Sequence, residues 1–210
     1  MRWTGFLVAC VLVLSASVAL GDAFKEAPKS ITLSIRGVIE RPALWWNSSQ
    51  ARAATLMHQS GATPQSWEFL AQRLQSVGVS SIAPLITSGE DVVAAIEFLD
   101  KQGVTDITLL GASIGGGAVQ QAVDRLDADR IDRIILLATA TGHALTNPDI
   151  PKLFIHARQD FFVGRSIQSF EKAVEPKTLV ELPGALHAQD LLKGPEGKFV
   201  EQLIVSFILN

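Results

Sequence analysis

The segment Gly111-Ala112-Ser113-Ile114-Gly115 has the residue types and spacing of a serine nucleophile on a tight strand-to-helix turn. A short apolar run precedes it, and a stretch with apolar residues at helical spacing follows it. Small residues flank such a serine because larger side chains would clash with the surrounding backbone. The start of the helix offers backbone N–H groups and partial positive charge to an oxyanion. The segment predicts a nucleophilic Ser113, against the alternative of a serine that only caps the helix.

Two possible partners of this serine lie in the loops after later apolar runs, Asp160 first and His187 second. His187 would take the proton of Ser113 as a general base and return it to the leaving group. Asp160 would hold the imidazole in one tautomer. Since an unassisted serine hydroxyl is a weak nucleophile, these partners make the prediction plausible. Asp190 is a rival acid, but it follows the histidine and breaks the order serine, acid, histidine.

Short apolar runs that alternate with longer amphipathic stretches must position these residues. We expect strands over 31–39, 53–57, 80–85, 106–110, 131–138, 152–157 and 178–182. We expect helices over 66–77, 91–99, 114–126, 167–174 and 198–209. This alternation predicts right-handed crossovers and a mostly parallel sheet with helices on both faces. The expected fold class is therefore α/β, a three-layer sandwich.

Taken together, these segments resemble the α/β-hydrolase superfamily, specifically its small serine-hydrolase and carboxylesterase-like members. The resemblance runs from about Ala53 to Asn210 and rests on four segments: Leu56–Gly61, Gly111–Gly116, the predicted strand that ends before Asp160, and Gly184–His187. It implies a catalytic triad of Ser113, Asp160 and His187.

The same resemblance points to a loop that would stabilise an oxyanion. In the family this loop usually begins His-Gly, whereas here His58 is followed by Gln59. The resemblance implies two donors, the backbone N–H groups of Ile114 and Ser60, and Gln59 is the alternative to Ser60. A bulky glutamine at this position would also narrow or reshape the acyl pocket. We expect His58 to brace the loop by hydrogen bonds.

Many larger hydrolases insert a helical cap after the sixth strand. Here only Thr141–Pro151 separates Ala140 from the next predicted strand, which leaves no room for a cap domain. We therefore expect an open cleft, which favours accessible esters or thioesters over small enclosed substrates.

Other polar and aromatic residues have structural interpretations. His156 lies within a predicted strand, so we expect a core histidine whose hydrogen bonds are satisfied. We expect Trp45 and Trp46 to pack under the edge of the sheet, with a surface contact to substrate or membrane as the alternative.

The composition indicates one folded domain and excludes several classes of protein. The 210 residues are 48% hydrophobic and 19% charged, which excludes a disordered or fibrous chain. With 18 basic and 21 acidic residues, a net charge of −3 and no basic stripe, nucleic acid is not an expected partner. No pair of histidines has the spacing of a metal site, so neither a metal nor another cofactor is expected.

The N-terminus predicts export. Arg2 precedes the run Phe6–Leu20, whose length of about 15 residues is short of the roughly 20 that span a bilayer. Small residues at Ala19 and Gly21 predict a signal peptide over 1–21 that is cleaved after Gly21. Lipidation at Cys10 and an uncleaved anchor are the alternatives. After cleavage, a cysteine-free protein in the periplasm or medium would have no stable membrane insertion.

These observations predict a signal peptide (1–21), an N-terminal strand region (22–52) and a catalytic core (53–210). The predicted function is an exported serine hydrolase that cleaves small-molecule or polymer carboxylic esters through an acyl-enzyme. One alternative is hydrolysis of a thioester, lactone or peptide bond by the same residues. Another, motivated by Gln59, is a non-catalytic binding protein with a hydrolase-like fold. The oligomeric state stays open.

Overall fold

The computed structural model describes residues 26–48 and 51–210, so the predicted signal peptide lies outside the described residues. Within those two ranges, no helix is long and apolar enough to cross a bilayer.

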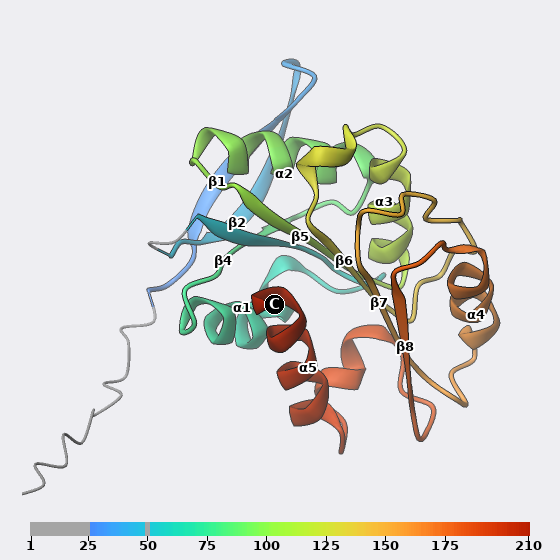
Figure 1. Cartoon of the computed structure of the whole chain (residues 1–210). Helices are drawn as coiled ribbons and strands as arrows, with labels where there is room; N and C mark the ends of the chain where they lie inside the picture. The colour runs from blue at the N-terminus through green and yellow to red at the C-terminus, as the bar shows by residue number, and fades with distance from the viewer. Residues whose placement is uncertain (1–25, 49–50) are drawn as a thin grey trace, which may run out of the picture.

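A single eight-stranded sheet forms the centre of the molecule (Figure 1). Its strands are β1 (Lys29–Ile35), β2 (Ile39–Trp46), β3 (Arg52–Met57), β4 (Ser80–Pro84), β5 (Asp106–Ala112), β6 (Arg133–Leu137), β7 (Lys152–Ala157) and β8 (Lys177–Leu182). Their order across the sheet is β1-β2-β4-β3-β5-β6-β7-β8. Strands β3 to β8 are parallel, whereas β1 and β2 are antiparallel to their neighbours.

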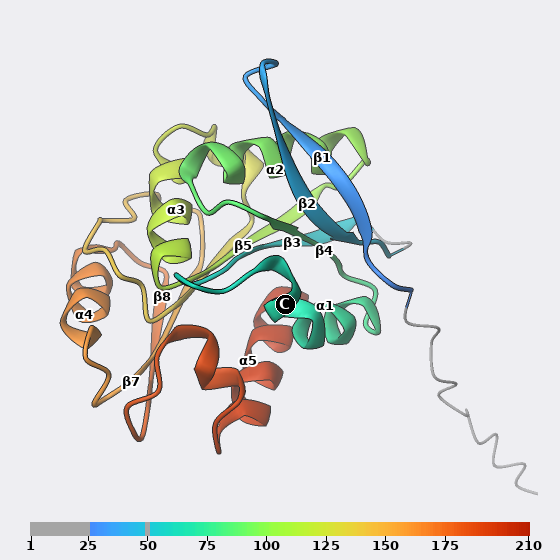
Figure 2. The same ribbon diagram turned by 180° about the vertical axis from the view of Figure 1, so that it is seen from behind.

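Helices cover both faces of this sheet (Figures 1 and 2). They are α1 (Glu68–Gln75), α2 (Gly89–Lys101), α3 (Ile114–Val123), α4 (Val163–Lys172) and α5 (Gly197–Leu209), with short 3₁₀ turns η1 (Pro64–Trp67), η2 (Ala128–Arg130) and η3 (Ala188–Leu192). Helices α2, α3 and α4 pack on one face, and α1 and α5 pack on the other. The predicted three-layer α/β sandwich is confirmed.

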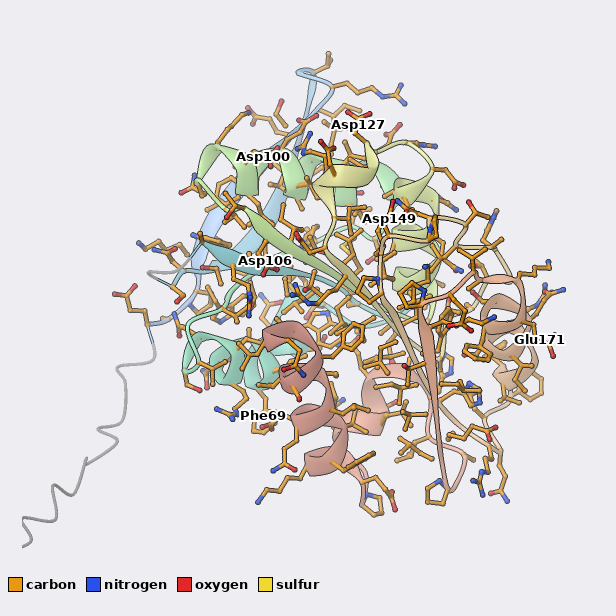
Figure 3. The ribbon with its side chains drawn as sticks, in the orientation of Figure 1. Phe69, Asp100, Asp106, Asp127, Asp149 and Glu171 are labelled. Carbon is orange, nitrogen blue, oxygen red and sulfur yellow. The ribbon has the colours of Figure 1, made fainter. Side chains whose placement is uncertain are left out.

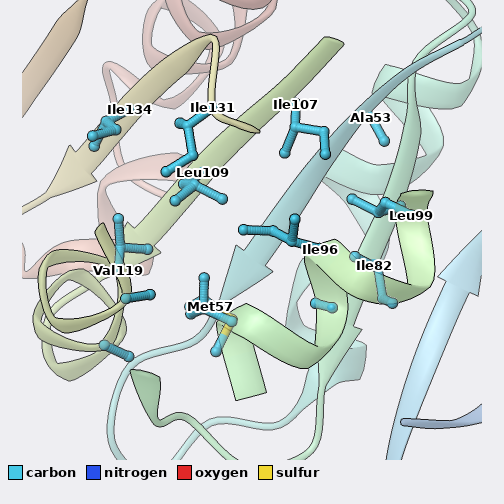
Figure 4. Packing of buried hydrophobic residues seen from close by; sticks show 14 of the residues in the cluster. Ala53, Met57, Ile82, Ile96, Leu99, Ile107, Leu109, Val119, Ile131 and Ile134 are labelled. Atoms are coloured by element: carbon cyan, nitrogen blue, oxygen red, sulfur yellow. The ribbon is translucent and has the colours of Figure 1, made fainter. Parts of the chain in front are cut away.

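Neighbouring residues of the central strands supply two separate cores. Met57 and Leu109 pack with Ile96 of α2 and Val119 of α3 on one face (Figure 4). The residues beside them in the chain, such as Leu56 and Leu110, pack on the opposite face against α1 and α5. Because both faces are buried, these strands read as continuous apolar runs rather than as alternating ones.

The single strand predicted over 31–39 is wrong, because the chain reverses there. Strand β1 ends at Ile35, and Arg36 and Gly37 both have positive φ, 51° and 70°. The turn places Val38 at the tip of a β1–β2 hairpin with 85% of its surface exposed. Apolar residues resume at Val38 and Ile39 directly after Arg36 and Gly37, and this extension of the apolar pattern hid the turn.

The tryptophan pair lies in β2, which no predicted strand covered. Trp45 packs edge-to-face on Phe98 of α2, with ring centroids 5.4 Å apart. Trp46 is fully buried in the core of the opposite face. The pair therefore packs on both faces of the sheet near its edge, and the alternative of a surface contact is wrong. The strands of region 22–52 belong to the same sheet as those of 53–210.

Charged residues form ion pairs at the amino end of the sheet. Asp106, which Figure 3 labels, lies at the start of β5. It accepts hydrogen bonds from Arg52 and Arg133, each at 2.6 Å. The opposite end, where β3 to β8 terminate, carries the loops that contain the predicted site residues, because the carboxyl ends of parallel strands meet at one edge. Between β6 and β7, residues 138–151 contain no helix or strand, so no cap domain is inserted there.

Candidate active site

Ser113 lies on a sharp turn between β5 and α3. Its φ of 53° and ψ of −115° fall outside the regions that a serine ordinarily adopts. Two backbone hydrogen bonds hold this conformation: the Ser113 N–H donates to Leu137 O at 3.0 Å, and Ala140 N–H donates to Ser113 O at 3.1 Å. Strain of this kind costs about 1–3 kcal/mol and persists only where the surrounding structure enforces it. The turn projects the serine at the carboxyl edge of the sheet.

Glycines allow the start of α3 to lie against the sheet. A Cβ on Gly115 would overlap the carbonyl of Met57 at the end of β3, and one on Gly116 would lie 2.6 Å from Thr139 Oγ1. Gly111 is equally restricted, because its Cβ would overlap the backbone of Gly115. Close approach of backbone to backbone therefore requires glycine at 111 and 115, and the Thr139 side chain requires it at 116.

Gly115→Ala is expected to destabilise the fold by about 3 kcal/mol, because neither β3 nor α3 can yield to the added methyl group. Chemical denaturation followed by circular dichroism measures this change. Gly164→Ala on α4 is the matched control, since nothing lies within 4 Å of its Cβ. It should be neutral or stabilising by up to about 1 kcal/mol. Equal stability of the two variants would contradict the packing described for Gly115.

Three predicted residues form one hydrogen-bonded chain. His187 Nε2 lies 2.8 Å from Ser113 Oγ, and His187 Nδ1 lies 2.7 Å from Asp160 Oδ2. The Asp160 side chain is 1% exposed, whereas that of His187 is 25% exposed. The base is thus partly exposed at the edge of the sheet, whereas Ser113, at 6% exposure, and the Asp160 carboxylate are buried. This arrangement can remove a proton from the serine and stabilise the resulting imidazolium.

The backbone orients the carboxylate of Asp160. Its Oδ1 accepts the N–H of Phe162 at 2.9 Å, which leaves Oδ2 for the histidine. The rival Asp190 contacts Lys193 at 3.2 Å and the side-chain amide of Gln59 at 3.5 Å. Its backbone N–H, rather than its carboxylate, contacts His187, through a 3.0 Å bond to the carbonyl. The structure therefore brings Asp160 to the histidine ring and not Asp190.

The expected oxyanion donors differ in their hydrogen bonding. Ile114 is the first residue of α3, where N–H groups have no acceptor within the helix. Ser60 is exposed in the loop after β3. The N–H of Gln59 instead donates to Gln189 Oε1 at 2.8 Å, so Gln59 is not a free donor. Among the three expected donors, Ile114 and Ser60 are the two whose N–H groups have no protein acceptor in the described parts of the chain.

Two other histidines have structural contacts. The ring nitrogens of His58 lie 3.0 Å from Gln59 O and 3.1 Å from Leu85 O, which ties the loop after β3 to the end of β4. His156 is fully buried, with Nδ1 3.0 Å from Ser166 Oγ and Nε2 3.4 Å from Glu181 Oε1. These contacts fit the bracing and core positions expected for the two residues.

Exposed apolar side chains lie in the loops at the edge of the sheet that carries the serine and the histidine. They follow the carboxyl ends of four parallel strands and are Leu85, Ile86, Ile114, Phe161, Phe162 and Leu186. The ring of Phe162 packs on that of His187, with centroids 5.2 Å apart. Sequence reasoning missed this apolar rim, although two adjacent phenylalanines directly after Asp160 were a visible signal for it. A rim of this kind offers apolar surface to a substrate bound at the serine.

Metal-ion chemistry has no evident site at this edge. Among the described residues, no group of three or more His, Cys, Asp or Glu side chains is placed to hold a metal ion.

Several solved structures share this architecture. The dienelactone hydrolase from Anabaena variabilis is 19% identical with a TM-score of 0.72, and the match covers 88% of this chain and 98% of that one. An esterase from Exiguobacterium antarcticum is 12% identical with a TM-score of 0.70, covering 87% and 100%. A predicted CIB-like hydrolase from Thermoplasma acidophilum is 18% identical with a TM-score of 0.67, covering 87% and 98%. No protein-family model and no curated protein matches the sequence. At these identities the likeness establishes the fold alone.

Proposed function

On the α/β-hydrolase fold that this chain has, we propose a serine hydrolase that cleaves carboxylic esters through an acyl-enzyme. The observation that carries the proposal is the hydrogen-bonded chain from Ser113 through His187 to Asp160, with distances of 2.8 and 2.7 Å. The neighbours named as esterases and hydrolases support the coarser part of the proposal, hydrolysis.

In the proposed mechanism, Ser113 Oγ attacks the carbonyl carbon of the ester while its proton moves to His187 Nε2. Asp160 stabilises the imidazolium. The N–H groups of Ile114 and Ser60 donate to the oxyanion of the tetrahedral intermediate. As the intermediate collapses, His187 gives the proton to the departing alcohol and the acyl group stays on Ser113. Water then attacks the acyl-enzyme, His187 takes its proton and returns it to Ser113 Oγ, and the carboxylic acid leaves.

The surroundings of the site support an ester with an apolar acyl group. The six rim residues are between 38% and 91% exposed and follow strands that end at the edge carrying Ser113, so they offer apolar surface to a substrate there. The short segment 138–151 leaves the site uncapped on the side of β6 and β7. An open apolar site of this kind admits small esters and also the ester groups of a polymer.

Phe162→Ala is expected to lower kcat/KM for p-nitrophenyl hexanoate about tenfold more than for p-nitrophenyl acetate, because a longer acyl chain loses more apolar contact. The ratio of the two substrates isolates this effect from any change at the neighbouring His187, which alters both equally. Phe199→Ala on α5 is the control, since its 51% exposure matches the 47% of Phe162. If Phe162→Ala leaves the ratio of kcat/KM for the two esters unchanged, Phe162 does not contact the acyl chain.

A fluorophosphonate probe and a substrate panel test the proposed function. The purified protein should be labelled covalently as Ser113 Oγ displaces fluoride from phosphorus, and it should hydrolyse p-nitrophenyl esters. Faster turnover of a thioester, a lactone or a peptide than of an ester would favour the alternative function, in which the same three residues hydrolyse one of those bonds. A well-folded protein that is neither labelled nor active on any of them would favour a binding protein.

We further propose that the protein is exported and that residues 1–21 are removed. The support is the charge and apolar pattern of the N-terminus. N-terminal sequencing of the protein from the cell envelope and medium tests this, with Asp22 as the expected first residue. Recovery of the intact N-terminus in the membrane fraction would favour the uncleaved anchor.

A further inference from the structure

Two glutamines join the loops on either side of the candidate site. The N–H of Gln59 donates to Gln189 Oε1 at 2.8 Å, and the N–H of Gln189 donates to Gln59 Oε1 at 2.8 Å. Each side chain thus binds the backbone of the other residue, although the two are 130 positions apart in the chain. We refer to this arrangement as the Gln59–Gln189 pair.

Further hydrogen bonds fix both members of the pair. Gln189 is 3% exposed, and its Nε2 donates to Ser66 Oγ at 2.8 Å at the start of the first helical segment. The carbonyl of Gln59 accepts the N–H of Ala62 at 3.2 Å and faces the ring of His58 at 3.0 Å. Gln59 Nε2 lies 3.5 Å from Asp190 Oδ2. The amide groups of the pair are therefore largely satisfied, so their geometry is well defined.

The pair lies next to a strained backbone position. Ala188 separates His187 from Gln189, is fully buried and has a φ of 48°, in the left-handed region that alanine disfavours. A bond from Asp190 N–H to His187 O at 3.0 Å closes this turn. Because strained positions persist only where the surroundings enforce them, Gln189 is well placed to hold the turn that carries the base.

We propose that Gln189 is a positioning residue that fixes His187 and the loop of Ser60 as one unit. Its side chain occupies the N–H of Gln59 and so leaves the N–H of Ser60, one residue later, as the second oxyanion donor. Its backbone binds the Gln59 side chain, a bond that the glycine usual in the family could not accept. The inference rests on the proposed ester hydrolysis and accounts for the departure at position 59.

Gln189→Met tests the inference, since methionine keeps the length of the side chain but removes its amide. We expect kcat for p-nitrophenyl acetate, per site titrated with fluorophosphonate, to fall about 10- to 100-fold. KM should change less than about threefold, because a misplaced oxyanion donor acts on the transition state rather than on bound substrate. Affinity for an arylboronic acid, which forms a tetrahedral adduct on the serine, should fall in parallel with kcat.

Gln59→Gly provides an independent variant, and the double variant measures coupling. Because the two residues act through one arrangement, their losses should not add. The kcat of the double variant should be no lower than that of the less active single variant. Gln121→Met, an exposed glutamine of α3, is the control and should keep the wild-type kcat. If Gln189→Met instead loses only thermal stability or titratable sites, with kcat per site unchanged, the positioning role is overturned. Multiplicative losses in the double variant would overturn the coupling.

The failure of this inference is distinguishable from failure of the proposed function. An active wild type with an unaffected Gln189→Met variant rejects the positioning role alone. A wild type that is neither labelled nor active rejects ester hydrolysis, and the positioning role with it.

Discussion

Ser113→Ala is expected to lower kcat/KM for acyl esters by about 10⁵-fold and to abolish labelling by a fluorophosphonate. The reason is that Ser113 Oγ is the atom 2.8 Å from His187 Nε2, on the turn between β5 and α3 at the carboxyl edge of the sheet. Initial rates with p-nitrophenyl acetate, together with intact-protein mass after labelling, measure both effects. Retained labelling in the variant would show that another residue is the nucleophile.

Ser166→Ala is the matched control for this variant. Ser166, His156 and Glu181 form a similar chain of serine, histidine and a carboxylate, here a glutamate, with contacts of 3.0 and 3.4 Å. Ser166 and His156 are fully buried, however, so no ester can reach them. Labelling and turnover should therefore stay at the wild-type level in the folded protein, as verified by circular dichroism.

Asp160→Asn is expected to lower kcat by about 10⁴-fold with little change in KM. The Phe162 N–H, 2.9 Å from Oδ1, should keep the amide oxygen of the asparagine on its own side. The NH₂ group then faces His187 Nδ1 and donates to it, which forces the ring proton onto Nε2. An Nε2 that carries a proton cannot accept the one on Ser113. Steady-state kinetics on titrated enzyme measure the loss.

Asp190→Asn separates this tautomer effect from a general loss of negative charge near the histidine. Its carboxylate contacts Lys193 and Gln59 rather than the ring, so activity should fall less than about tenfold. A larger loss in Asp190→Asn than in Asp160→Asn would contradict the assignment of Asp160 as the acid.

Local patterns were sufficient to predict most of the scaffold. Strands β3 to β7 are buried on both faces, so most of them appear as short apolar runs between helical stretches. The fold class followed from the alternation of strands and helices. The glycines around Ser113 were also readable, because a strand-to-helix turn requires small residues wherever it occurs. The β1–β2 hairpin could not be predicted from local patterns, since exposed Val38 and Ile39 extend the apolar pattern past the turn.

The sequence by itself determined which residue types stand at the ends of the parallel strands, and hence the candidates Ser113, Asp160 and His187. Only the tertiary structure decided that Asp160 rather than Asp190 meets the imidazole. It also decided that the N–H of Gln59 donates to Gln189, whereas the N–H of Ser60 has no acceptor among the described residues. The structure also revealed the hydrogen bonds of Gln189 to Gln59, which no local sequence pattern predicted. The physical reason is that these contacts are hydrogen bonds between residues up to 130 positions apart in the chain. A bond of about 3 Å forms only when the folded sheet brings the two loops together.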